Sequence, residues 1–199
     1  MDISRTCKLL FLTSLAWFSL SAYSNNEEIK QQFKKLNELA NFEVAFQQTK
    51  MLKDLNFTIK SSGNLKVSKP SNIVWKVTQP SYLEVNIDPD TVTIVSKEMD
   101  GTTQKQIYKY DKRPKNAEGY SSLLNLMSLL SMNIEQLVKE YDIVEKSKKK
   151  FLFTPKLKSD VFKNILVQLG NDNLIKRVDL QESSGDTINI IFQGYKINQ

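Results

Sequence analysis

The sequence predicts an α+β protein built on one large antiparallel β-sheet with two helical segments. From residue 41 onward, apolar and polar residues alternate with a period of two through most of the chain. Turn-forming residues interrupt this alternation at short intervals. Two helical segments cannot cover both faces of so long a sheet, so we expect it to bend strongly and to carry the helices on its concave face. A closed barrel or a sandwich would satisfy the same pattern.

The first 24 residues have the character of a secretory signal peptide. Arg5 and Lys8 precede an apolar run of 12 residues, 9–20, and Ala22-Tyr23-Ser24 fits the small-x-small cleavage pattern. A run of 12 is much shorter than the roughly 20 residues that span a bilayer. We therefore expect residues 1–24 to be removed on export and residues 25–199 to form one domain. The single cysteine, Cys7, precedes the predicted cleavage site, so a lipid anchor on cysteine is not expected.

Composition excludes several classes of function for residues 25–199. They contain no cysteine and no histidine, which rules out disulfides, Ser-His-Asp triads and Cys/His zinc sites. The net charge of the whole chain, +6, comes mainly from lysine, which argues against nucleic acid binding. It is compatible with contact with anionic membranes and equally with general solubility. Asp88 and Asp90 flank a turn proline without a third ligand nearby, so we expect no enzyme, no metal and no cofactor.

The first helix is predicted directly after the cleavage site. Asn26 can cap it, and Ile29, Phe33 and Leu36 recur at helical spacing to give one apolar stripe. At Asn41 the period changes to two, which marks the start of the sheet.

The strands that follow are predicted from residues that share one face. These are Phe42, Val44 and Phe46; Phe57 and Ile59; Leu65 and Val67; Ile73, Trp75 and Val77; Leu83, Val85 and Ile87; residues 91–95 and 106–110; Phe151 and Phe153; Ile165, Val167 and Leu169; and residues 174–180 and 187–192. Asp88-Pro89-Asp90, residues 170–173 and residues 183–186 have the composition of turns between them.

The second helical segment interrupts the strands between Tyr120 and Glu140. Its apolar residues recur at helical spacing, and the segment can form one helix or two. It holds more leucine and methionine than a single packing seam requires. The recurring residues are Leu123, Met127, Leu130, Ile134 and Val138.

Several short motifs occur along residues 25–199 in a characteristic order. They are Phe46-Gln47-Gln48, Gly63-Asn64-Leu65, Lys69-Pro70, the strand from Trp75 to Pro80, Phe151-Leu152-Phe153-Thr154-Pro155-Lys156, and the hairpin from Gly185 to Phe192. In this order they resemble the motifs of the LolA-like family, the periplasmic lipoprotein carriers of Gram-negative bacteria. The resemblance selects a half-open barrel among the possible bent sheets, and it covers nearly all of residues 25–199.

The resemblance implies a function without catalysis. A family member is a periplasmic chaperone that holds lipoprotein acyl chains in an apolar cavity and moves them from an inner-membrane donor complex to an outer-membrane acceptor. We expect a monomer with helices as the lid of the cavity and Lys69 as the latch that holds the lid closed. The expected lining residues are Ile73, Trp75, Val77, Leu83, Val85, Leu123, Met127, Leu130, Phe151 and Phe153.

The sequence departs from the family at three places, which leaves alternatives open. A typical Asp-Gly hairpin with a tryptophan is missing, Lys69 replaces an arginine, and Ile73 replaces a phenylalanine. The protein could carry another envelope lipid, or it could be a LolA-like sensor that binds a protein. Trp75 and the stripe over residues 123–130 are also compatible with an ordinary core. The lysines of residues 146–150 are expected at a solvated hairpin tip, with docking to an acidic partner as the alternative.

Overall fold

Eleven antiparallel strands form one continuous sheet in the computed structural model, which describes residues 27–69, 72–98, 100–109, 126–127, 130, 134–157 and 161–198. The elements are a helix over residues 27–38, β1 (Asn41–Leu52), β2 (Phe57–Ser68), β3 (Asn72–Gln79), β4 (Leu83–Ile87), β5 (Thr91–Lys97), β6 (Thr103–Lys109), α3 (Ile134–Glu140), β7 (Tyr141–Ser147), β8 (Lys150–Pro155), β9 (Phe162–Leu169), β10 (Ile175–Glu182) and β11 (Thr187–Asn198). The predicted signal peptide, residues 1–24, lies outside these residues and stays a prediction.

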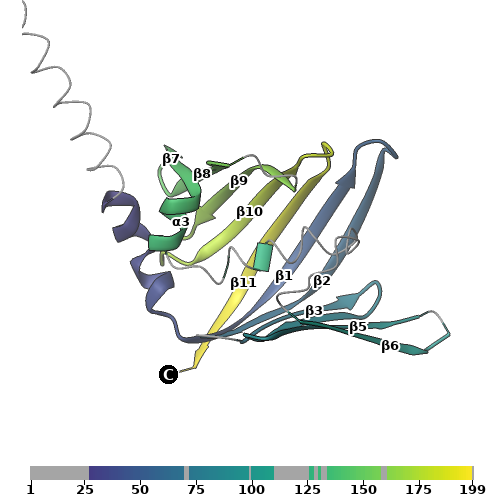
Figure 1. Cartoon of the computed structure of the whole chain (residues 1–199). Coiled ribbons are helices and arrows are strands. Elements are labelled where there is room, and N and C mark those ends of the chain that lie inside the picture. Colours follow the sequence, from purple (N-terminus) through teal and green to yellow (C-terminus); the bar gives the residue numbers. More distant parts are fainter. Residues whose placement is uncertain are drawn as a thin grey trace, which may run out of the picture.

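The order of the strands explains why the sheet is open. It runs β6-β5-β4-β3-β2-β1-β11-β10-β9-β8-β7, so two meanders join where the first strand pairs with the last. Strands β6 and β7 are the two edges, and the sheet curves between them without closing (Figure 1). The prediction of a single curved antiparallel sheet with helices on one face is confirmed.

The two-residue alternation of the sequence gives the sheet one apolar face. In β1, Phe42, Val44 and Phe46 are buried, whereas Ala45 and Gln47 point to the other face and are exposed. The same alternation occurs in the neighbouring strands, and the buried residues of all of them belong to one hydrophobic cluster. Burying this face is the main source of stability, at about 25 cal/mol for each Å² of apolar surface.

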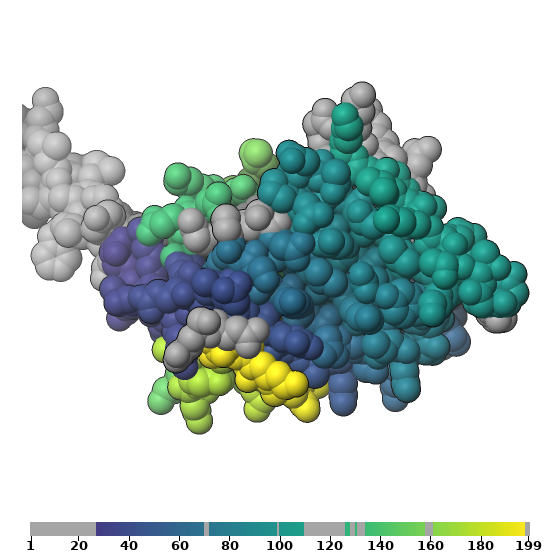
Figure 2. All heavy atoms as spheres, turned by 90° about the horizontal axis from the view of Figure 1, so that it is seen from below, coloured from purple at the N-terminus to yellow at the C-terminus, as the bar shows by residue number. Residues whose placement is uncertain are grey.

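The first helix and α3 lie on the concave side of the sheet, next to the half formed by β7 to β10 (Figure 1). Ile29 and Phe33 of the first helix, Met127, and Leu137 of α3 are all buried in the same cluster as the strand residues. Viewed from below, the first helix and the end of β11 occupy one side of the molecule and strands β4 to β6 the other (Figure 2).

The predicted helices are confirmed where the structure describes them. The first is helical over residues 27–38. Lys30 pairs with Glu27 of the same helix at 2.8 Å and links the helix to α3 through Glu135 at 3.2 Å. In the second segment, residues 126, 127 and 130 are helical and α3 spans Ile134–Glu140. The remainder of the predicted segment, including Leu123, lies outside the described residues.

Two features of the sheet differ from the sequence analysis. Strand β7 follows α3 directly and was not predicted, because Ile143 is its only buried residue and charged residues dominate the rest. The strand over Phe57 and Ile59 is present, but these side chains are 58% and 38% exposed and contribute little to the core.

Gly63 marks a close approach of two backbones. A Cβ atom built on it would lie 1.8 Å from the carbonyl oxygen of Lys76 and 2.9 Å from the Cα of Val77. The register between β2 and β3 shifts at this point, between Ser62 and Gly63. Only glycine fits here, because backbone atoms cannot give way as the end of a flexible side chain can.

We predict that Gly63→Ala lowers the free energy of unfolding by about 1–3 kcal/mol, because the methyl group forces β2 and β3 apart. Gly170→Ala is a matched control: its Cβ would come close only to the flexible carboxylate of Asp172, at 2.6 Å, while the nearest backbone atom, the oxygen of Leu174, lies at an ordinary 3.7 Å. Urea unfolding of the two variants measures the difference. Equal stability would show that the backbone adjusts freely at Gly63.

Candidate functional site

Three aromatic rings meet at the middle of the concave face. The indole of Trp75 on β3 stacks on Phe46 of β1, with ring centroids 3.9 Å apart and an interplanar angle of 24°. Phe192 of β11 meets the same indole edge-on at 6.5 Å. Strand β2 lies between β1 and β3, and it has Gly63 opposite Phe46. Because glycine has no side chain, the two large rings can meet across the intervening strand.

The structure places the predicted lining residues in one cluster. On the sheet, Ile73, Trp75, Val77, Val85, Phe151 and Phe153 are buried, and Leu83 is half-buried against them. From the second helical segment, Met127 is buried and Leu130 is half-buried in the same cluster. Leu123 is the one predicted lining residue outside the described part of the chain. These side chains are tightly covered: the exposed fraction of Trp75 is 1%.

The first helix covers the β8 end of this cluster through one phenylalanine. The ring of Phe33 contacts Phe151 at 5.0 Å and Phe153 at 5.9 Å, both edge-on. Sequence reasoning placed Phe33 on the apolar stripe of the helix but not at the site, and it did not assign Phe46 or Phe192 to the lining. For Phe46 and Phe192, the available signal was that each alternates in phase with the other buried residues of its strand. Any ligand that enters between helix and sheet here has to displace Phe33.

Lys69 ties the first helix to the turn between β2 and β3. Its Nζ donates hydrogen bonds to the backbone oxygens of Leu36 at 3.1 Å and Asn37 at 3.2 Å. Its own backbone N–H donates to the oxygen of Ala40 at 2.8 Å. A cation is favourable at the C-terminal end of a helix, where backbone carbonyls lack partners. Burial lowers the pKa of Lys69 below its ordinary value.

Asn37 extends the same set of contacts to α3. Its side-chain oxygen accepts a hydrogen bond from the backbone N–H of Ile134, the first residue of α3, at 3.2 Å. Asparagine is a favourable cap for a helix N-terminus because it satisfies such an unpaired N–H. Lys69, the first helix and α3 are therefore connected through one residue, which the sequence analysis did not single out.

We predict that Lys69→Met loosens the first helix without unfolding the sheet. Losing two partly buried hydrogen bonds from a charged donor costs about 1–2 kcal/mol, so hydrogen exchange in residues 29–38 should accelerate about tenfold. Lys34→Met is the control, because Lys34 is exposed on the same helix and its contact with Glu38 is 3.8 Å long. If the two variants exchange alike, Lys69 does not hold the helix.

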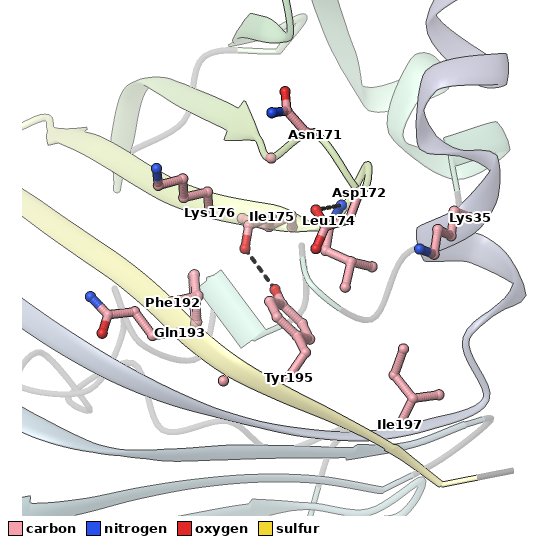
Figure 3. A pocket seen from close by; sticks show the side chains of 12 residues that line it. Lys35, Asn171, Asp172, Leu174, Ile175, Lys176, Phe192, Gln193, Tyr195 and Ile197 are labelled. Carbon is pink, nitrogen blue, oxygen red and sulfur yellow. Dashed lines mark hydrogen bonds between the residues drawn. The ribbon is translucent and has the colours of Figure 1, made fainter.

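A cavity of about 620 Å³ lies between β10, β11 and the first helix (Figure 3). Lys35, Asn171 and Lys176 border it along with apolar side chains. Tyr195 projects into it and donates a hydrogen bond to the backbone oxygen of Ile175 at 2.7 Å. Burial, followed by the charge of Asp172, raises the pKa of Tyr195. The mixed polarity of this cavity does not match an acyl chain.

We predict that Tyr195→Phe changes the alkaline limb of the stability curve. The unfolded chain releases the tyrosine proton above about pH 10, whereas the folded chain keeps it, so the free energy of unfolding falls as the pH rises beyond that value. The variant lacks this contribution and loses the hydrogen bond, which costs about 1 kcal/mol at pH 7. Urea unfolding at pH 7 and pH 10.5 should show a smaller alkaline loss for the variant. An equal loss would contradict the assignment.

An ion pair lies at the opposite end of the concave face from Lys69. Lys50 of β1 donates to both carboxylate oxygens of Glu182 of β10, at 3.2 and 3.1 Å. Glu182 is 6% exposed and is the one charged residue that is buried among those the structure describes. The sequence analysis missed the pair because its members are 132 positions apart. It marks the polar boundary of an otherwise apolar face.

Two further observations concern metals and membranes. Within the ranges that the structure describes, no three or more His, Cys, Asp or Glu side chains are grouped to hold a metal ion. No helix in those same ranges is both long enough and apolar enough to cross a bilayer.

Fold and site together define a class of half-barrel proteins, in which a bent antiparallel sheet presents an apolar concave face to covering helices. The model of the family "outer membrane lipoprotein carrier protein LolA" matches residues 37–199. The chain belongs to this family, which confirms the resemblance identified from its motifs.

Relatives and solved structures are similar over most of the chain. The outer-membrane lipoprotein carrier protein of Pseudomonas putida (strain GB-1) is 25% identical over 198 residues, which are 98% of this chain and 90% of that protein. The corresponding protein of Pseudomonas entomophila (strain L48) is 23% identical with the same coverage. The crystal structure of a LolA superfamily protein from Nitrosomonas europaea has 9% identity and a TM-score of 0.42, and covers 85% of this chain and 93% of that one.

Proposed function

We propose that this protein is a periplasmic carrier that holds the acyl chains of lipoproteins on the concave face of its sheet. One observation carries the proposal: a continuous apolar face is covered by helices that are tied down at one end through Lys69. The family is one of lipoprotein carriers, which supports the same class of cargo. The lining we propose is Ile73, Trp75, Val77, Leu83, Val85, Leu123, Met127, Leu130, Phe151 and Phe153.

The energetics favour a carrier that is closed in the absence of cargo. Each acyl methylene withdrawn from water contributes about 0.8 kcal/mol, so a lipid with two or three chains that was fully enclosed would not leave. A carrier can release its cargo if opening the lid costs part of that gain. Separating Phe33 from Phe151 and Phe153, and Lys69 from its two carbonyl partners, is such a cost.

We further propose the direction and setting of transport. After removal of residues 1–24 the protein acts in the periplasm as a monomer, receives lipoproteins from an inner-membrane donor complex and passes them to an outer-membrane acceptor. The role is that of a chaperone and requires no catalysis. Family membership supports this direction, since the relatives bear the name of outer-membrane lipoprotein carriers.

We predict that an acyl-chain probe reaches Trp75. Export would remove Trp17 and leave Trp75 as the only tryptophan, so a doxyl-labelled fatty acid should quench its fluorescence saturably. Ile73→Glu and Leu130→Glu should each weaken binding at least tenfold, because a buried carboxylate opposes an apolar ligand. Ile107→Glu is the control, since Ile107 is 60% exposed on the edge strand β6.

Leu130→Glu keeps the experiment decisive if Ile73→Glu fails to fold, because Leu130 is only half-buried. Circular dichroism establishes the fold of each variant before titration. Probe binding that is unaffected in folded Leu130→Glu, or quenching that never saturates in the unmodified protein, would contradict the cavity assignment.

A second candidate is a LolA-like regulatory protein that binds another protein. The close stacking of Trp75 on Phe46 and the 1% exposure of Trp75 favour this second function, because the protein's own side chains fill the concave face. The same titration distinguishes the two functions, since a sensor of this kind takes up no acyl chain. A carrier for a different envelope lipid would bind the probe but not an acylated lipopeptide.

A further inference from the structure

The β1–β2 hairpin projects beyond β3, its neighbour on one side, whereas on the other side β1 stays paired with β11 as far as Met51. Strand β2 pairs with β3 only from Ser62 onward, opposite Gln79, so residues 57–61 have no partner on that side. Five residues of strand correspond to about 17 Å of length. Figure 1 shows this hairpin rising well above β3.

The hairpin tip, residues 51–60, carries an unusual concentration of exposed apolar side chains. Leu55 is 72% exposed, Phe57 58%, Met51 43% and Ile59 38%. These are four of the eight large apolar side chains that are exposed among the residues the structure describes. Single exposed apolar residues are common in proteins, but a group of four in ten residues indicates a contact surface.

The apolar residues of the tip lie on both sides of the hairpin. Phe57 and Ile59 share one face, where their cross-strand partners are Leu52 and Lys50. Met51 lies on the other face, opposite Thr58. Leu55 lies in the turn itself. A groove on a partner protein would contact one face of a two-stranded ribbon, whereas a bilayer can receive apolar side chains from both faces.

The tip is held in position by a contact with the β10–β11 hairpin, which lies beside it in the sheet. The backbone N–H of Lys53 donates to the carboxylate of Asp186, at 2.9 Å, and Asn56 closes the turn with a hydrogen bond to the oxygen of Lys53. The exposed residues are therefore presented on a supported turn. Burying them would require another surface to come to the tip.

The lysines of the tip indicate which surface that is. Within the tip, Lys53 and Lys60 stand against one acidic residue, Asp54. Asp186 of the β10–β11 hairpin lies against the backbone of Lys53, and Lys50 at the base is paired with Glu182. Lysines that flank inserted apolar residues can reach anionic headgroups while their alkyl chains stay in the apolar layer. We propose that the β1–β2 hairpin tip is a membrane-contact surface that inserts shallowly into bilayers with anionic headgroups.

Vesicle cosedimentation tests this directly, with phosphatidylglycerol–phosphatidylethanolamine vesicles and with phosphatidylcholine vesicles. The full chain, purified from the periplasmic fraction of a Gram-negative host, should bind the anionic vesicles more tightly. The double variant Leu55→Asp/Phe57→Asp should bind them at least tenfold more weakly, because two apolar side chains no longer enter the bilayer. Ile107→Asp is the matched control, since Ile107 is 60% exposed on a distant strand, and it should bind normally.

The lysines and the cargo site supply further readouts. Lys53→Glu/Lys60→Glu should reduce the preference for anionic vesicles, whereas Lys105→Glu on β6 should not. The tip does not belong to the proposed acyl-chain lining, so the Leu55→Asp/Phe57→Asp protein should still bind the acyl probe. Failure of the membrane contact and failure of the carrier function are thereby separable.

Three outcomes would overturn the proposal. In the first, the unmodified protein does not sediment with anionic vesicles. In the second, the Leu55→Asp/Phe57→Asp variant binds as well as the unmodified chain. In the third, the unmodified chain does not bind vesicles but forms a dimer in solution, and the double variant abolishes that dimer. The partner of the tip would then be a second copy of the chain.

Discussion

The need to cover one apolar face governs this structure. Eleven strands with the same two-residue alternation produce a single face of buried residues, and bending lets that face enclose itself only in part, because the edges β6 and β7 do not pair. Helices complete the cover. The first helix takes part through the contacts of Phe33 with Phe151 and Phe153, so the apolar surface that stabilises the fold is the one we propose for the acyl chain.

The two ends of the concave face differ in chemistry. At one end, Lys69 and Asn37 connect the first helix and α3 to the sheet through polar contacts, which can be broken at less cost than a packed core. At the other end, the Lys50–Glu182 pair closes the apolar face below the projecting hairpin. The proposed opening of the lid and the proposed membrane contact therefore involve separate parts of the molecule.

The sequence predicted the elements that depend on local periodicity. Two-residue alternation placed Trp75 on a buried strand face. Helical spacing placed the first helix within two residues of its observed ends. It could not predict long-range polar pairs such as Lys50–Glu182, because such contacts leave no periodic signal. Nor could it show that Phe57 lies beyond the end of β3, since exposure there depends on strand lengths rather than on alternation.

The most direct test of the account is a distance measurement between helix and sheet with and without cargo. Spin labels on cysteines introduced at positions 34 and 163, exposed on the first helix and on β9, report whether the helix moves; export would remove Cys7, the single native cysteine. The account predicts that stoichiometric acylated lipopeptide lengthens this distance and that removing the lipopeptide restores it. Saturated binding with an unchanged distance would contradict the exchange of helix for acyl chain on the concave face.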